Sequence, residues 1–129
     1  MRTKVLAASA MVALWPLQVG AQDAGVADTG DFAVETGQDL LDLCSVDASH
    51  SLHAEALQFC AGFLEGMKHY HDRMSAGPDV EPIVCAPSNV TVEDAIGTYV
   101  AYARANPQFL NEDPADNVIR AAMATWPCS

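Results

Sequence analysis

Apolar residues recur every three or four positions in four separate segments of the chain, which is the spacing of amphipathic helices. The longest segment covers about 51–74, and its apolar stripe continues to Met74; the others cover about 37–45, 91–106 and 114–126. No segment alternates between apolar and polar residues for long enough to predict a strand. The pattern therefore predicts an all-α fold, a small bundle of about four helices interrupted by a long loop over 75–89.

Helix-start signals fix three of the boundaries. Thr36 with Asp39 three residues later has the arrangement of a capping box before the first helix. Thr91 stands at the N-cap position of the third helix, where its hydroxyl can accept from a free backbone N–H. Asp113 followed by Pro114 is a strong start signal for the fourth helix, because proline suits the first helical turn.

The first 21 residues have the pattern of a secretory signal peptide. Arg2 and Lys4 form a positive head, an apolar run follows over 5–17, and small residues precede the expected cleavage after Ala21. The apolar run is short for a membrane span, so we expect no membrane association after cleavage; an uncleaved anchor is the alternative. The sequence therefore predicts export to the periplasm.

Cleavage leaves 108 residues, the size of one small domain. Residues 22–35 are small, acidic and without period, which predicts a flexible arm ahead of a helical domain over 36–129. Four basic residues then stand against 17 acidic ones, and the formal charge becomes −13. Such a balance disfavours nucleic acid as a partner. It suits a basic protein partner, although solubility alone is the alternative explanation.

The four cysteines of the exported chain predict two disulfides, since an even number is usual in small exported domains. A short link joins the third and fourth helices, so we expect these helices to be antiparallel. Cys85 precedes the third helix and Cys128 follows the fourth, which brings the two together. The remaining pair, Cys44 and Cys60, then joins the first two helices.

The sequence offers little catalytic or metal chemistry. It contains no G-x-S-x-G, H-E-x-x-H or S-x-x-K motif, so we expect no enzyme activity and no cofactor. His69 and His71 project about 200° apart on a helix, and His50 and His53 stand at a helix start. We therefore predict no metal site, with copper or zinc binding by these histidines as the alternative.

Two acidic clusters stand at predicted helix starts. One is the pair Glu93 and Asp94, and the other combines Glu112, Asp113 and Asp116. Carboxylates are favoured at this position by the helix dipole, so capping explains both clusters. Contact with a basic partner and acid–base chemistry are the alternatives.

Two glycines, Gly62 and Gly66, lie inside the longest predicted helix, where each costs about 1 kcal/mol relative to alanine. Small residues four apart allow two helices to approach closely. We expect this packing to occur within the chain, next to Cys60; contact with the same helix of a second copy is the alternative.

Several short motifs occur in an order that resembles the Rap/Tai family of type VI secretion immunity proteins. They are TGQDLLDLC (36–44), CAGFLEG (60–66), CAPSNVT (85–91), YVAYARANP (99–107) and WPC (126–128). The resemblance covers residues 36–128. It matches the four cysteines to those of the family, and it matches four residues to packing positions, namely Gly62, Gly66, Trp126 and Pro127.

The resemblance implies a helical periplasmic protein that binds a peptidoglycan amidase toxin and blocks its cleft, often as a homodimer. It identifies no toxin-contacting residue. The exposed, acidic segment 75–84, with Asp79 and Glu81, is our candidate for the inserted part, and Glu93 and Asp94 are further candidate contacts. A periplasmic acid-stress chaperone, or a family member with another binding role, is the alternative function.

Overall fold

The computed structural model describes residues 32–129, and within them it contains four α-helices and no strand. The helices are α1 (Gly37–Cys44), α2 (His53–Met74), α3 (Val92–Ala105) and α4 (Pro114–Thr125), with a short 3-10 helix η1 (Pro107–Phe109) between α3 and α4. The predicted all-α fold is confirmed for this part of the chain. The predicted signal peptide and the first part of the arm lie outside the described residues.

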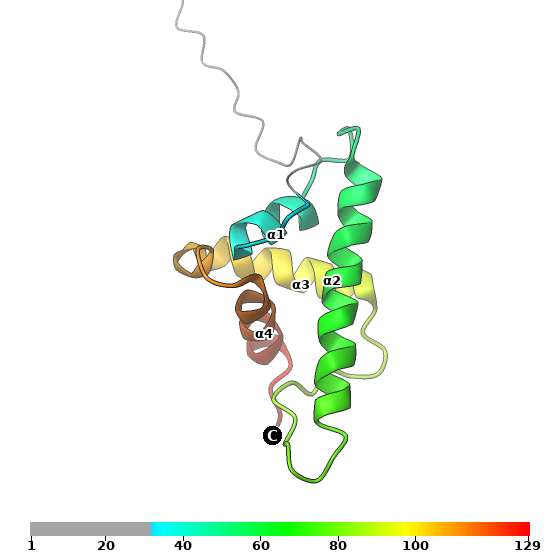
Figure 1. Cartoon of the computed structure of the whole chain (residues 1–129), viewed down its shortest axis with the longest axis vertical. Helices are drawn as coiled ribbons and strands as arrows, with labels where there is room; N and C mark the ends of the chain where they lie inside the picture. The colour runs from blue at the N-terminus through cyan, green and yellow to red at the C-terminus, as the bar shows by residue number, and fades with distance from the viewer. Residues whose placement is uncertain (1–31) are drawn as a thin grey trace, which may run out of the picture.

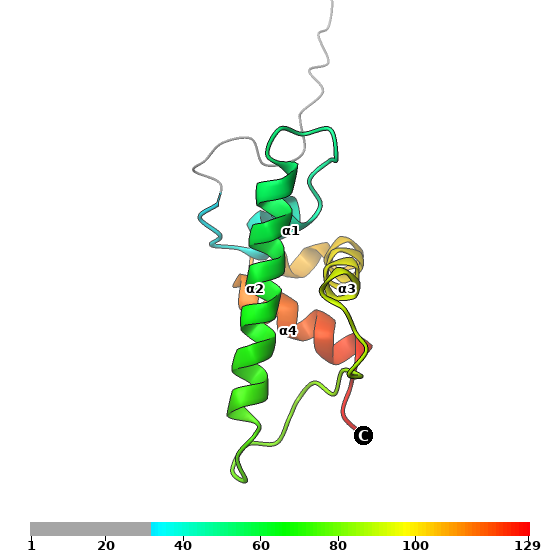
Figure 2. The same ribbon diagram turned by 90° about the vertical axis from the view of Figure 1, so that its right-hand side faces the viewer.

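Helix α2 runs the length of the folded part, while α1, α3 and α4 lie against one side of it (Figures 1 and 2). Helix α1 covers the first half of α2. The chain returns from the far end of α2 through a long segment to the start of α3. This return leaves the second half of α2 beyond the packed part of the bundle.

The predicted helix starts are confirmed by hydrogen bonds. Thr36 Oγ1 accepts from Asp39 N at 3.3 Å, and an Asp39 carboxylate oxygen accepts from Thr36 N at 2.8 Å. A second capping box joins Thr91 and Asp94 at the start of α3, and Asp113 caps α4. Each cap satisfies backbone N–H groups that the first turn of a helix leaves without partners.

Helix α2 begins at His53, slightly later than the predicted start near residue 51. The preceding residues form a turn in which His50 N donates to Asp47 O and His53 N donates to His50 O. Leu52 occupies the N-cap position and has no side-chain oxygen to offer the helix. The turn therefore replaces the first helical residues that the apolar spacing predicts.

The core lies where α1 meets the other three helices. Its most buried side chains, each at most 1% exposed, are Leu40, Cys60, Tyr99 and Ala103. A smaller neighbouring cluster includes Phe32, whose ring centroid lies 5.9 Å from that of Phe59. Residues 32–35 of the predicted arm therefore contribute to the packed part of the molecule.

Both predicted disulfides are present. Cys44 and Cys60 are buried and join α1 to α2, with their Cα atoms 5.2 Å apart. Cys85 and Cys128, with Cα atoms 5.0 Å apart, join the segment before α3 to the chain end after α4. The pair is present although the predicted antiparallel arrangement of α3 and α4 is wrong, because these two helices cross steeply in Figures 1 and 2.

The predicted packing of Gly62 and Gly66 within the chain is wrong. Both glycines are exposed, and a Cβ atom built on either would meet no atom within 4 Å. Cys60 and Leu64 point to the core, and each glycine follows one of them by two residues, about 200° around the helix. The glycines therefore face away from the other helices, and contact with a second copy remains a prediction.

The close approach occurs instead at Gly37, at the start of α1. A Cβ atom on Gly37 would lie 2.5 Å from Cγ of the fully buried Asn117 of α4. The Tyr99 hydroxyl donates to the Gly37 carbonyl at 2.9 Å, and burial, with the nearby Asp42 carboxylate, raises the Tyr99 pKa. Gly37 N donates to Glu112 O at 2.9 Å. These contacts fix α1 against α3 and α4, and the sequence motifs did not predict them.

Candidate partner-binding surface

One end of the molecule combines the second half of α2 (65–74), the returning segment (75–91) and the chain end (123–129), which lie together at the bottom of Figure 1. We call these residues the open end. All five large apolar side chains that are strongly exposed in the described chain belong to it: Tyr70, Met74, Val80, Ile83 and Met123. Their exposed fractions range from 43% to 66%. Apolar exposure gathered at one end makes the open end the candidate contact surface.

A cavity of about 520 Å³ lies beside this surface, between the second half of α2, the returning segment, α3 and α4. Its apolar walls include Met67 of α2, and Val84 and Val90 of the returning segment. Ile119 of α4 and Trp126, which follows this helix, complete them. Lys68, His71 and Asp72 of α2 line it as well. The volume lies in the range of sites that accept a small molecule.

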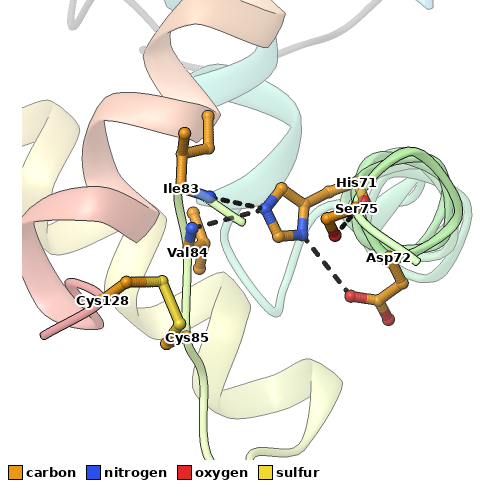
Figure 3. Close-up of a disulfide and its surroundings, with 7 residues drawn as sticks. All are labelled: His71, Asp72, Ser75, Ile83, Val84, Cys85 and Cys128. Carbon is orange, nitrogen blue, oxygen red and sulfur yellow. Dashed lines mark hydrogen bonds and ion pairs between the residues drawn. A yellow bond between two sulfur atoms is a disulfide. The ribbon is translucent and has the colours of Figure 1, made fainter. Parts of the chain in front are cut away.

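We call residues 82–90 of the returning segment the strap; the part of it from Val84 onward borders the cavity. Figure 3 shows His71 pointing from α2 toward it. The backbone N–H groups of Ile83 and Val84 both donate to His71 Nε2, at 3.2 and 3.3 Å. His71 Nδ1 lies 3.5 Å from a carboxylate oxygen of Asp72. The His71 side chain is 15% exposed, and it fastens the strap to α2.

The other fastening of the strap is at the chain end. Cys85 is bonded to Cys128, and Cys85 N donates to Trp126 O at 2.9 Å. The Trp-Pro-Cys motif thus holds the strap against the end of α4. Trp126 also lines the cavity, whereas Pro127 next to it is exposed, and the packing role that the resemblance implies for these two residues stays a prediction.

Asp72 connects the histidine to a basic residue. The hydrogen bond from Lys68 lowers the pKa of the Asp72 carboxyl; burial opposes this effect, and His71 adds to it. Lys68 and Asp72 stand one turn apart on the exposed face of α2. Asp72 is therefore a stable carboxylate beside the imidazole at neutral pH.

The four predicted contact residues occupy two places. Asp79 and Glu81 are exposed on the returning segment, within the open end. Glu93 and Asp94 stand at the neighbouring start of α3, where Asp94 is occupied with capping. Backbone and side-chain hydrogen bonds from Thr91 lower the Asp94 pKa. The structure thus leaves Asp79, Glu81 and Glu93 free of capping, and their contact with a partner stays a prediction.

The second acidic cluster has structural roles. Glu112 pairs with Arg120 at 3.0 Å, and Asp113 caps α4 by accepting from Ala115 N at 2.8 Å. Asp116 stands in the first turn of α4, where the helix dipole favours negative charge. Capping and ion pairing account for this cluster, as the sequence indicated.

Two further histidines make local contacts. His50 Nδ1 accepts from Leu52 N at 3.1 Å, and His53 Nδ1 lies 3.2 Å from Val46 O. Residues 32–129 contain no group of three or more histidine, cysteine, aspartate or glutamate side chains placed to hold a metal ion. None of the helices in the same range has the length and apolar character that crossing a bilayer requires.

Fold and surface together define a small, disulfide-linked helical binding protein. A model of the Rap1a immunity proteins matches residues 36–128, which is most of the chain. The protein therefore belongs to the Rap1a immunity protein family, and the resemblance inferred from the motifs is confirmed. Searches of curated proteins and of solved structures gave no significant match. Family membership indicates an immunity protein that binds a secreted effector, and it favours a non-catalytic role.

Proposed function

We propose that the protein is a periplasmic inhibitor of a secreted peptidoglycan amidase and that it binds this enzyme through the open end. It neutralises the effector by occupying its cleft and performs no chemistry of its own. Family membership supports the immunity role. The signal-peptide pattern of residues 1–21 supports the location, because a peptidoglycan amidase acts outside the cytoplasm.

The observation that carries this proposal is the position of the exposed apolar residues. Tyr70, Met74 and Ile83 remain exposed at the end that also carries Asp79 and Glu81. An interface typically combines an apolar centre with a polar rim, and complementary charge steers the encounter. The open end therefore suits a cleft with apolar walls and basic residues around its mouth.

The shape of the open end suits an inhibitor that inserts. The second half of α2 extends beyond the core, since Leu64 is the last buried residue of this helix. The returning segment closes the tip and carries two of the three prolines of the loop there, Pro78 before the strap and Pro82 at its first position. Proline restricts the backbone, which lowers the entropy that the segment loses when it binds.

The test uses purified oxidised protein and a secreted peptidoglycan amidase encoded beside it. Binding is measured by calorimetry and inhibition by release of peptidoglycan fragments. The double substitution Asp79→Lys with Glu81→Lys should weaken binding about tenfold or more, because it reverses the charge of the rim. A matched control, Glu55→Lys with Asp116→Lys, makes the same change in net charge at exposed positions outside the open end.

Equal weakening by both double substitutions would contradict the assignment of the surface, since only net charge would then matter. Failure of the unsubstituted protein to inhibit the amidase would contradict the proposed target. Sequencing the N-terminus of the exported protein tests the location, and it should begin at residue 22.

We also propose that the protein forms a homodimer through the face of α2 that carries Gly62 and Gly66. The described chain leaves this face open, and two α2 helices can approach closely where side chains are absent. Sedimentation velocity at several concentrations tests it, and a monomer throughout the micromolar range would contradict it.

A further inference from the structure

His71 and the strap form a contact that depends on the protonation state of one ring nitrogen. An imidazole nitrogen that accepts hydrogen bonds carries no proton. Nε2 of His71 faces two donors, Ile83 N and Val84 N (Figure 3). The contact therefore requires a neutral His71 whose proton is on Nδ1, directed toward Asp72.

We propose that His71 is a proton-operated latch, which fastens the strap to α2 when neutral and releases it when protonated. Protonation places an N–H group on Nε2, directly opposite two backbone N–H donors. Both hydrogen bonds are then lost, and three donors face one another. Histidine is the side chain that commonly changes its charge between about pH 5 and pH 8, so mild acidification operates the latch.

The protonated imidazole keeps partners on α2. Asp72 lies 3.5 Å from Nδ1, and His71 belongs to the last turn of α2, where backbone carbonyls favour positive charge. The positive charge of Lys68 repels a protonated His71 only in part, since Lys68 pairs with Asp72. A protonated His71 can therefore keep its contact with Asp72 on the helix while it loses the attraction to the strap.

The other elements around His71 bring little further charge. The strap contains no ionisable side chain, because Cys85 is bonded to Cys128 and does not titrate. The acidic residues of the neighbouring segments flank the strap: Asp79 and Glu81 precede it, and Glu93 and Asp94 follow it. His71 is thus the group whose titration bears directly on the strap.

Release frees one side of the strap and leaves the other attached. The disulfide between Cys85 and Cys128 holds the strap at the chain end, so the movement is confined to the residues between the end of α2 and Val84. That stretch carries Asp79 and Glu81, and Val84 at its end lines the cavity. An effect on effector binding rests on the proposed function, but the latch itself does not.

The first test needs no substitution. Two-bond nitrogen–proton correlation spectra of the ¹⁵N-labelled oxidised protein identify the protonated ring nitrogen of each histidine. At about pH 7.5 we expect His71 to carry its proton on Nδ1 alone. Hydrogen-exchange protection of the Ile83 and Val84 amides, corrected for the intrinsic pH dependence of exchange, should fall about tenfold between about pH 7.5 and about pH 5.5. A proton on Nε2 at the higher pH, or unchanged protection, would overturn the proposal.

Substitutions then assign the effect to this residue. In His71→Gln the glutamine side chain does not titrate, so protection of the two amides should no longer depend on pH. His69→Gln is the matched control, because His69 is exposed on the same helix and does not contact these amides. His69→Gln should follow the unsubstituted protein. If His71→Gln retains the full pH dependence, another group operates the strap and the proposal fails.

Discussion

The two halves of α2 have the same apolar spacing, but the first half is packed against other helices and the second half is exposed. The first half buries Ala56, Cys60 and Leu64 against α1, α3 and α4. The second half has no buried residue, and its apolar residues Tyr70 and Met74 are exposed. Helical periodicity predicts which face of a helix is apolar, but it does not say what covers that face. Under the proposed function, the uncovered half is where the effector binds.

The largest effects should come from the disulfides. In the chain-entropy model, Cys85→Ala with Cys128→Ala lowers the free energy of unfolding by about 4 kcal/mol, because this bond closes the longer loop. Cys44→Ala with Cys60→Ala should cost about 3 kcal/mol by the same model. Urea unfolding followed by circular dichroism measures both. A clearly larger cost for the second pair would show that packing in the core outweighs loop closure.

Truncating a side chain in the core should lower the free energy of unfolding much more than truncating one at the open end. Leu40 is fully buried, and Leu40→Ala should lower the free energy of unfolding by about 3 kcal/mol through lost burial and a new cavity. Met74→Ala, at an exposed position of the open end, should change it by less than about 0.5 kcal/mol. The measurement is again urea unfolding. A large cost for Met74→Ala would mean that the open end is part of the packed core.

The exposed glycines give a prediction of stabilisation. Gly62→Ala and Gly66→Ala each place a methyl group in open space within a helix, so each should raise the free energy of unfolding by about 1 kcal/mol. Thermal and urea unfolding at low concentration measure this effect in the monomer. If α2 forms the proposed dimer contact, the same substitutions should weaken dimerisation in sedimentation experiments. A destabilised monomer would contradict the open surroundings of these positions.

The smallest effect concerns the cap of α1. Burial raises the pKa of Asp39, but hydrogen bonds from Thr36 and the Glu35 backbone outweigh it and hold the pKa below its usual value. A carboxyl with a lowered pKa in the folded state stabilises the protein above its unfolded pKa, and this contribution is lost as the pH falls through the folded value.

Asp39→Asn should therefore lower stability by less than about 1 kcal/mol near pH 7, and the difference should shrink as the pH falls below about 4. Urea titrations at both pH values measure it. Glu55→Gln makes the same charge change at an exposed position and serves as the control. A difference that grows in acid would reverse the sign of this argument.

The starts of the helices were predicted well because each start signal lies within a few neighbouring residues. The capping boxes at Thr36 and Thr91 and the Asp113–Pro114 start each depend on contacts within one turn. The disulfide pairing was also predicted correctly, since Cys85 and Cys128 flank two helices that are adjacent in the sequence and pack against each other. These predictions needed no knowledge of distant packing.

Long-range contacts were the ones that the sequence concealed. Tyr99 and Gly37 meet across 62 positions, and His71 meets Val84 through backbone N–H groups, which have no signature in the sequence. The glycines of α2 were misassigned because spacing shows that two small residues share a face, but not which face points inward. Exposure and charge pointed to Asp79 and Glu81 in the sequence. No sequence signal pointed to the contact between His71 and the strap.

The anchoring of α2 by Cys60 makes this helix a lever. Met74 lies 14 residues beyond the anchor, which corresponds to about 21 Å along the helix axis. A tilt of about 10° at the anchor would displace the tip by about 4 Å. The second disulfide and His71 act near the long arm, where a modest restraint resists the greatest displacement. A small change in fastening at that point would therefore produce a large displacement of the far end of α2.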